Sequence, residues 1–334
     1  MGLDVSIGIS PRESLADWMR LASELEAGGV DRIWLIDSQL AMKDVYAGLI
    51  TAALNTSTVE LGPGVTNLLT RDPTVTASAI AAVSEVSGGR ALLGVGAGDS
   101  AVKGLGRRPS RIAELEEGLG RLRRLLGGAP ANADGETLSL PYAPGDVRLH
   151  LAVSRPRMCR LAGRVADGAI IMGPATSELV REQVGWIHEG VIESGRDASE
   201  VELSFVAPTS IEDGSDDPLR DVRSWASAQA RLLADVAELP PTLEQHREEL
   251  TRAKTGYDYG EHLSTRASHQ DSISDELTAK LAIAGSAERC AGRLKELRAA
   301  GIERLIFPLT PPARLARLEK LRELLQSPVP KGAR

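Results

Sequence analysis

The chain has 334 residues, of which 42% are hydrophobic, which is enough for a large buried core. Its formal net charge is −7 and only 3% of its residues are aromatic, so it has neither the basic tract nor the stacking surface that nucleic acids or anionic membranes require. The N-terminal segment shows no signal peptide or membrane span, which predicts a cytoplasmic protein, and the cysteines, Cys159 and Cys290, form no disulfide or zinc pattern.

Short apolar runs alternate with helical patterns along the chain. The runs predict strands at Val5–Ile9, Arg32–Ile36, Val59–Val65, Ala91–Val95, Val147–Val153, Gly168–Met172, Val201–Ala207 and Ile302–Pro308. The helical patterns lie at Pro11–Ala27, Val45–Leu54, Pro73–Val86, Arg111–Leu126, Met158–Ala166, Glu178–Glu193 and Ala287–Ala300. A doubly wound open sheet needs only about six strands. The longer series therefore favours an α/β fold of the (β/α)8 TIM-barrel type.

The segment 209–274 interrupts the alternation after the seventh predicted strand. It holds an acidic loop (Ser210–Pro218), a helical pattern over Leu219–Glu238, a further helix opened by Pro240-Pro241, and an irregular polar stretch (Lys254–Ser274). We predict a single barrel domain over residues 1–326, with 209–274 as an insertion on the active-site face and 327–334 as a disordered tail. The insertion forms either a lid or wall over the substrate or a helical buttress.

The segment Val59–Asp99 is the most informative part of the chain because both of its strands end in glycines and small polar residues. The motif GPGVTN (Gly62–Asn67) predicts a bulge with a distorted Gly64-Val65 peptide against a planar ligand, or a simple barrel bend. The motif GVGAGD (Gly94–Asp99) has a carboxylate where a dinucleotide fingerprint has its third small residue, and the next helix is expected only near Pro109. We interpret it as a glycine platform for a flat ring with Asp99 as a polar contact, or as a tight strand exit with a capping aspartate.

Three further groups of polar residues are candidates for ligand contacts. Asp37-Ser38-Gln39 ends the second strand and can bind a ligand or cap a helix. Ser154-Arg155-Pro156-Arg157 opens a helix and suits either a phosphate or an N-cap, and Gly173 at the end of strand six could complete the same pocket. His262 and His269, in the insertion, are possible acid/base groups. The histidine spacing predicts no metal site.

Four segments resemble the bacterial luciferase-like superfamily, and within it the deazaflavin (coenzyme F420) enzymes similar to methylenetetrahydromethanopterin reductase. They are Trp34–Tyr46, Leu61–Gly106, Ser154–Gly173 and Ala284–Leu309. The resemblance implies a TIM barrel, often a homodimer, with a flavin or deazaflavin at the carboxyl ends of the strands and a non-proline cis peptide at Gly64-Val65. By position it implies cofactor contacts from Gly64, Val65, Thr66, Asn67, Gly98, Asp99, Ser100, Ala152, Ser154 and Arg155.

The chain departs from the family pattern at two positions. Several members have Asp-His after strand two, where this chain has Asp37-Ser38. The methanopterin reductases carry a glutamate in strand one, and the aligned position in this chain is Gly8. Both differences argue against the methylene-pterin reaction itself and leave cofactor binding intact.

The leading hypothesis is an F420-dependent oxidoreductase that transfers a hydride to or from a small-molecule substrate. Asp37, Ser38 and Asp99 are the predicted catalytic contacts to the ring or substrate, and a buried aspartate of raised pKa could serve as the proton donor. The alternatives are a monooxygenase that uses reduced flavin mononucleotide (FMN) and oxygen, and a cofactor-binding barrel without catalysis.

Overall fold

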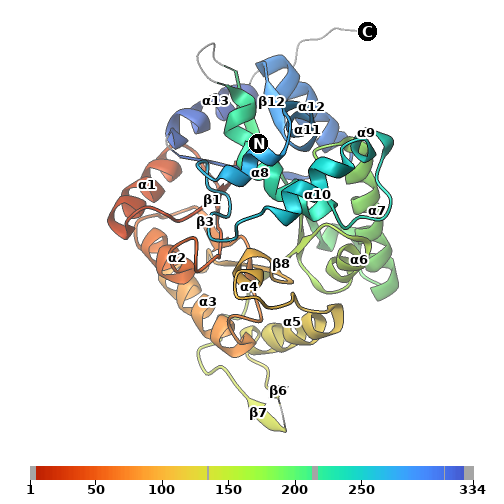
Figure 1. Ribbon diagram of the computed structural model, residues 1–334. Helices are drawn as coiled ribbons and strands as arrows, with labels where there is room; N and C mark the ends of the chain where they lie inside the picture. Colours follow the sequence, from red (N-terminus) through yellow and green to blue (C-terminus); the bar gives the residue numbers. More distant parts are fainter. Residues whose placement is uncertain (1–4, 134, 213–216, 312, 327–334) are drawn as a thin grey trace.

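The computed structural model describes residues 5–133, 135–212, 217–311 and 313–326, and it shows a ring of parallel strands surrounded by helices (Figure 1). The described sheet runs in the order β3-β2-β1-β13-β10-β9-β8-β5-β4. A parallel bridge between Leu61 and Ala91 places β3 beside β5 and closes the ring. The TIM-barrel prediction is therefore confirmed. The strands are β1 Ser6–Ile9, β2 Arg32–Leu35, β3 Glu60–Pro63, β4 Thr66–Asn67, β5 Leu92–Gly96, β8 Arg148–Val153, β9 Gly168–Ile171, β10 Glu202–Val206 and β13 Arg304–Pro308.

The outer helices lie close to their predicted positions, except α13, which was not predicted. They are α1 Leu15–Ala27, α2 Val45–Leu54, α3 Pro73–Ser87, α5 Ile112–Leu126, α6 Pro156–Val165, α7 Ser177–Ser194, α12 Ala287–Ala299 and α13 Arg314–Gln326. Local signals set their ends: Asp72 caps α3 by accepting a hydrogen bond from the amide of Thr74, and Gly88 ends it in the left-handed conformation. The prediction that the first helix begins at Pro11 was wrong, because Ser14 accepts from the amide of Asp17 and starts the helix there.

The elements that the sequence analysis missed include a hairpin, a single helical turn and the last described helix. The hairpin of β6 (Ala131–Ala133) and β7 (Glu136–Leu138) projects from the barrel (Figure 1). The single turn α4 (Ser100–Lys103) follows Asp99 directly, so a helix begins well before Pro109. The helix α13 closes the described part of the chain.

The interior of the barrel is filled in layers. At the amino-terminal ends of the strands, Arg32 Nε donates to Glu60 Oε2 at 2.9 Å and Arg32 Nη1 donates to Glu202 Oε1 at 2.6 Å. The next layer holds Trp34 and His150, whose rings meet edge to face with their centroids 5.3 Å apart. Arg32, Trp34 and His150 are all buried, so this end of the barrel is closed.

Close packing explains two of the glycines in the segment Val59–Asp99. A Cβ atom on Gly62 would lie 2.6 Å from the carbonyl oxygen of Leu92, one on Gly94 would lie 2.3 Å from that of Pro63, and both would also crowd Cζ3 of Trp34, at 3.0 and 3.1 Å. These two glycines therefore let the backbone and the indole pack closely, and neither of them lines the cavity at the other end of the barrel. Three other glycines of the motifs GPGVTN and GVGAGD, namely Gly64, Gly96 and Gly98, line this cavity at the carboxyl ends of the strands.

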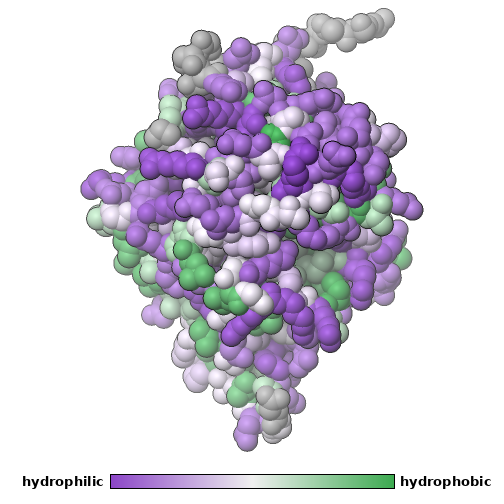
Figure 2. Space-filling model, in the orientation of Figure 1, coloured by the Kyte–Doolittle hydropathy of each residue, from purple (hydrophilic) through white to green (hydrophobic). Residues whose placement is uncertain are grey.

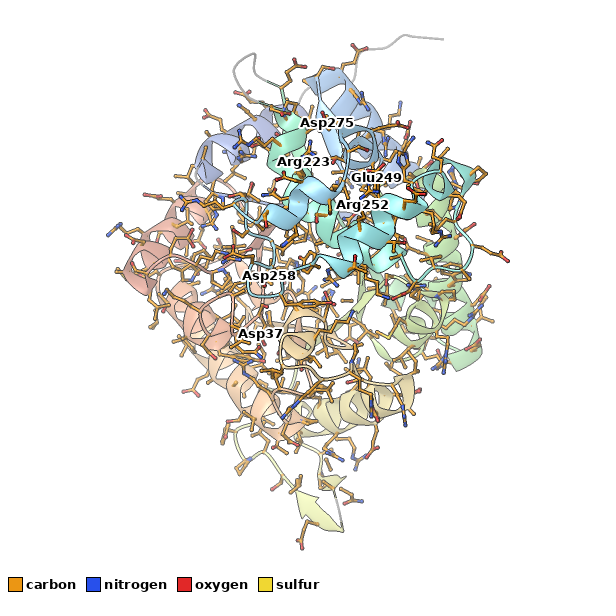
Figure 3. The ribbon with its side chains drawn as sticks, in the orientation of Figure 1. Asp37, Arg223, Glu249, Arg252, Asp258 and Asp275 are labelled. Carbon is orange, nitrogen blue, oxygen red and sulfur yellow. The ribbon has the colours of Figure 1, made fainter. Side chains whose placement is uncertain are left out.

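The insertion packs over the carboxyl ends of the strands. Its elements are β11 Thr209–Ile211, α8 Pro218–Leu233, α9 Pro241–Glu244, α10 Arg247–Thr255, the 3-10 turn Ser268–Ser272, α11 Asp275–Leu281 and β12 Ile283–Gly285. β11 pairs in parallel with β12, so the two ends of the insertion are joined. An apolar cluster that includes Ala226, Leu250 and Leu277 gives α8, α10 and α11 a core of their own. In Figure 3, Arg223, Glu249 and Asp275 of the insertion lie on one side of the molecule, away from Asp37 of the barrel.

The elements of the insertion differ in their bounds from the predicted ones. The helix predicted over Leu219–Glu238 ends at Leu233, and Lys254–Ser274 consists mostly of turns. Part of the acidic loop and the whole tail 327–334 lie outside the described residues. Cys159 and Cys290 are both free and buried. Within the described ranges, no helix combines the length and the apolar character that a bilayer span requires.

Candidate active site

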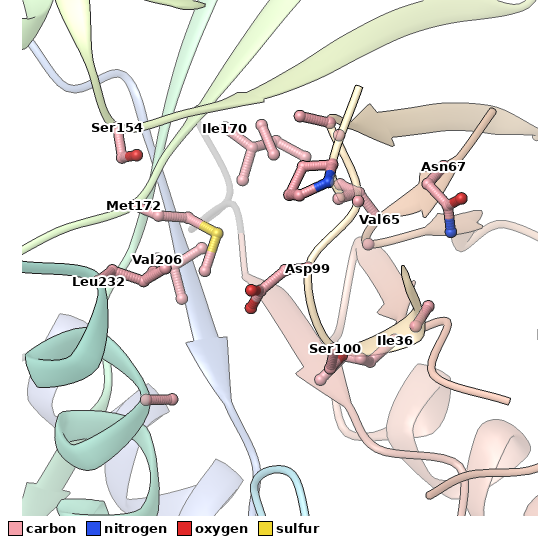
Figure 4. A pocket seen from close by; sticks show the side chains of 18 of the residues that line it. Ile36, Val65, Asn67, Asp99, Ser100, Ser154, Ile170, Met172, Val206 and Leu232 are labelled. Atoms are coloured by element: carbon pink, nitrogen blue, oxygen red, sulfur yellow. The ribbon is translucent and has the colours of Figure 1, made fainter. Parts of the chain in front are cut away.

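A cavity of about 350 Å³ lies at the carboxyl ends of the barrel strands. Figure 4 shows Met172, Val206 and Leu232 on one side of it and Val65 and Asn67 on the other, with the Asp99 carboxylate between them. Most of the lining is apolar and comes from Ile36, Val65, Met158, Ile170, Met172, Val206, Trp225, Leu232 and Leu263. Ligands of α/β barrels bind at this end of the strands, so this cavity is the candidate active site.

The cavity brings together most of the residues predicted as ligand contacts. They are Asp37, Gly64, Val65, Thr66, Asn67, Gly98, Asp99, Ser100, Ala152, Ser154 and Arg155. The Gly64-Val65 peptide is cis, as the resemblance implies. Ser38 does not line the cavity: its hydroxyl lies behind the wall and donates to Ser100 Oγ at 2.9 Å. Gly173 lines a neighbouring cavity of about 630 Å³, which shares Ser154 and Arg155 with the first.

Asp37 has the surroundings of a carboxyl that can hold a proton. Its Oδ2 accepts hydrogen bonds from Thr66 Oγ1 at 2.7 Å and from Arg71 Nη1 at 2.8 Å. Its Oδ1 is buried and has no hydrogen-bond partner within the described residues. Burial raises the pKa of Asp37 above its ordinary value, although Thr66 and Arg71 oppose this. The side chain does not cap α2, because Asp44 does so by accepting from the amides of Tyr46 and Ala47.

Asp99 has a different role because it is paired with a cation from the insertion. Arg231, on α8, donates from Nη1 to Asp99 Oδ1 at 2.9 Å, and its Nη2 bonds Oδ2. Burial alone would raise the pKa of Asp99, but the hydrogen bonds and charge of Arg231 outweigh it and hold the pKa at about 2. Asp99 is therefore ionised at neutral pH, and of the two predicted aspartates only Asp37 has a pKa above its ordinary value. The Asp99 side chain makes no capping hydrogen bond to α4.

The insertion adds aromatic residues to the wall of the site. The Arg231 guanidinium lies 4.3 Å from the ring centroid of Tyr257, and Tyr257 Oη lies 2.6 Å from His262 Nδ1. His262 lines the cavity, whereas His269 packs on the far side of Tyr257 at 4.2 Å between ring centroids and does not line it. Sequence reasoning missed Arg231 and Tyr257, because neither belongs to a local motif and both gain their meaning from contacts across the fold.

The amino terminus of α6 borders the same cavity. Arg155 is its N-cap residue, and no side chain caps the first turn, so the capping alternative for Ser154-Arg155 is not observed. Arg155 instead donates from Nη2 to the carbonyl oxygen of Leu232 at 2.9 Å, which ties the strand end to the insertion. Uncapped amides at a helix amino terminus beside a hydroxyl and a guanidinium suit a phosphate group.

The fold and the cavity define a TIM-barrel protein whose ligand site lies at the carboxyl ends of its strands. The chain matches the model of the luciferase-like monooxygenase family over residues 3–304 and belongs to this family.

Three proteins of assigned activity are similar to this chain in sequence or in structure. A 5,10-methylenetetrahydromethanopterin reductase of Methanolobus tindarius is 29% identical over 314 residues, covering 89% of this chain and 90% of the relative. An F420-dependent glucose-6-phosphate dehydrogenase of Kineococcus radiotolerans is 27% identical over 234 residues, covering 64% of this chain and 68% of the relative. The solved structure of the coenzyme F420 dependent tetrahydromethanopterin reductase of Methanopyrus kandleri superimposes with a TM-score of 0.77 at 21% identity, covering 97% and 98% of the two chains.

Proposed function

We propose that this protein is a coenzyme F420-dependent oxidoreductase that transfers a hydride to or from a small organic substrate. The observation that carries the proposal is the form of the cavity. It is a mostly apolar slot beside the segment Gly64–Asn67, with Asp37 in its wall and the uncapped start of α6 at its edge. A planar ring with a phosphate-bearing tail fits these features, and the names of the relatives point to the deazaflavin. When bound, a deazaflavin supplies or accepts the hydride.

The residues of the chain position the reactants and exclude water. Ser154, Arg155 and the first amides of α6 would hold the phosphate, and the segment Gly64–Asn67 would support the ring. Asp37 would contribute a polar contact at the wall of the slot, and burial raises its pKa, although Thr66 and Arg71 oppose this. The helix α8 covers the slot through Trp225 and Leu232 and keeps it apolar.

A binding titration tests this proposal. We expect deazaflavin to bind at least about tenfold more tightly than FMN, a difference of about 1.4 kcal/mol, as read from cofactor fluorescence and absorbance. A protein that binds neither cofactor contradicts the proposal. The runner-up is an FMN-dependent monooxygenase, which the name of the family model supports. Oxygen uptake with reduced FMN, together with weak deazaflavin binding, would favour it.

We also propose that the protein forms a homodimer, as the resemblance implies. The helices α2 and α3, which pack side by side, expose the apolar side chains of Leu54, Val75 and Val86. Figure 2 shows apolar surface on the side of the molecule where Figure 1 draws these helices. Exposed apolar residues that gather on one side of a protein are typical of an interface. Light scattering on the purified protein should give twice the mass of the chain, and a monomeric mass would contradict the proposal.

A further inference from the structure

We propose that His262, which the insertion supplies, hydrogen-bonds the reacting oxygen of the substrate, and that Tyr257 behind it passes a proton through the imidazole. The substrate would then be a neutral carbonyl compound or the corresponding alcohol. This inference rests on the proposed function, since the deazaflavin exchanges the hydride. It develops the sequence prediction that His262, in the insertion, is an acid/base group, while the segment after strand two, with Asp37-Ser38, offers no imidazole.

The geometry leaves one nitrogen of His262 free for a ligand. Nδ1 lies 2.6 Å from Tyr257 Oη, whereas Nε2 has no hydrogen-bond partner among the described residues. The imidazole belongs to the wall of the cavity that also contains Asp37 and Val65, and the residue is only 8% exposed. Nε2 is not among the fully buried side-chain atoms that lack a partner, so it is accessible from the cavity, and the molecule that fills the cavity most simply satisfies it.

The backbone around His262 is held in place from two sides. Arg12, which follows β1, donates from Nη2 to the carbonyl oxygen of His262 at 2.6 Å. The next residue, Leu263, adopts a φ of 59°, a conformation that a branched residue rarely takes, and its side chain packs in the apolar cluster at the mouth of the barrel. These contacts fix the direction of the imidazole, as a group that must meet a substrate atom requires.

The neutral charge of the His262 imidazole suits a group that donates a hydrogen bond to a neutral oxygen. Burial lowers the pKa of His262 to about 3, and Arg231 and Arg12 act in the same direction while Asp99 opposes them, so the imidazole is neutral at physiological pH. A neutral imidazole whose Nδ1 accepts the Tyr257 hydroxyl carries its proton on Nε2. Burial raises the pKa of Tyr257 to about 12, and the nearby Arg231 guanidinium counteracts this by favouring the phenolate.

The step balances in the direction of reduction. A bound reduced deazaflavin would supply the hydride to the carbonyl carbon, and the π electrons of the C=O bond would move to the oxygen. The oxygen would take the Nε2 proton of His262 while Nδ1 takes the Tyr257 hydroxyl proton, which leaves a phenolate beside Arg231 and a neutral imidazole protonated on Nδ1. After the product leaves, Nδ1 returns its proton to the phenolate and Nε2 takes a proton from a water molecule in the cavity, which restores the starting state. Oxidation of the alcohol follows the same path in reverse.

The test uses isobutyramide, an unreactive carbonyl compound, as a probe of the full-length protein with and without deazaflavin. Binding of the probe should lower its C=O stretching frequency in the infrared. In His262→Leu the affinity should fall about five- to tenfold, the usual cost of one lost hydrogen bond, and the band should return to its position in water. His269→Gln is the matched control, because His269 packs on the same tyrosine outside the cavity, and it should behave like the wild type.

A second measurement does not depend on the His262 variant folding. In histidine labelled with nitrogen-15, we expect the His262 resonances of the wild type to show a neutral ring protonated at Nε2, and Tyr257→Phe to yield a mixture of tautomers. Protonation at Nδ1 in the wild type, equal probe affinity in His262→Leu, or no binding of the probe to the wild type would overturn the proposal. Failure of the deazaflavin to bind would instead overturn the proposed function, since the probe is also measured in its absence.

Discussion

The buried His150 makes the stability of the fold depend on pH in a way that one substitution should remove. His150 is 0% exposed and neither of its ring nitrogens has a hydrogen-bond partner within the described residues. Burial lowers its pKa from 6.5 to about 4, although the nearby Glu202 opposes this. Since the folded pKa is the lower one, the unfolded chain binds more protons between these values, and stability is lost as the pH falls below 6.5.

The size of this effect follows from the two pKa values. Between about pH 7.5 and about pH 5, a shift of this size removes about 2 kcal/mol from the free energy of unfolding. His150→Leu, which keeps an apolar group against Trp34, should retain stability near neutral pH and lose this part of the pH dependence. Urea unfolding of both proteins over this range measures the difference. Equal pH dependence in the two proteins, or an NMR titration of His150 with a midpoint near 6.5, would refute the reasoning.

Three further substitutions test other parts of the structure. A Cβ on Gly168 would lie 2.2 Å from His150 Nδ1, so Gly168→Ala should lower the free energy of unfolding by about 1–3 kcal/mol in denaturant titrations; unchanged stability would contradict the interior packing. Asp99→Asn leaves the charge of Arg231 buried without its counter-charge, so hydrogen exchange of the α8 amides should become faster. Equal exchange rates in the two proteins would show that the ion pair does not hold the insertion in place. Ala152→Phe places a ring inside the cavity and should weaken deazaflavin binding about tenfold or more, with an unchanged circular dichroism spectrum as the control for folding.

The barrel could be predicted from the sequence because each strand is a buried apolar run between turn residues. The same reasoning missed β6 and β7, because Ala131–Ala133 and Glu136–Leu138 are short, largely exposed and carry no apolar alternation. It also missed α13, although Arg314–Gln326 contains buried leucines.

The candidate site was predictable where a contact depends on the end of a strand, as for Asp37 and Val65. It was not predictable where a contact joins distant segments. Asp99 was interpreted as a ligand of the ring, yet its main partner is Arg231, 132 residues away. Gly94 was likewise interpreted as part of a platform for a ring, but a Cβ there would lie 2.3 Å from the carbonyl oxygen of Pro63, so its role is close packing of the backbone. Local patterns show which residues can lie at the rim, and packing decides what each of them contacts.

The closed end of the barrel has a kinetic consequence. Because Arg32, Trp34 and His150 seal the interior below the cavity, both reactants must pass the same opening under α8. The reactant that lies deeper has to arrive first and depart last, so we expect a compulsory-order mechanism. Exchange of one reactant should then slow down when the other is supplied in excess.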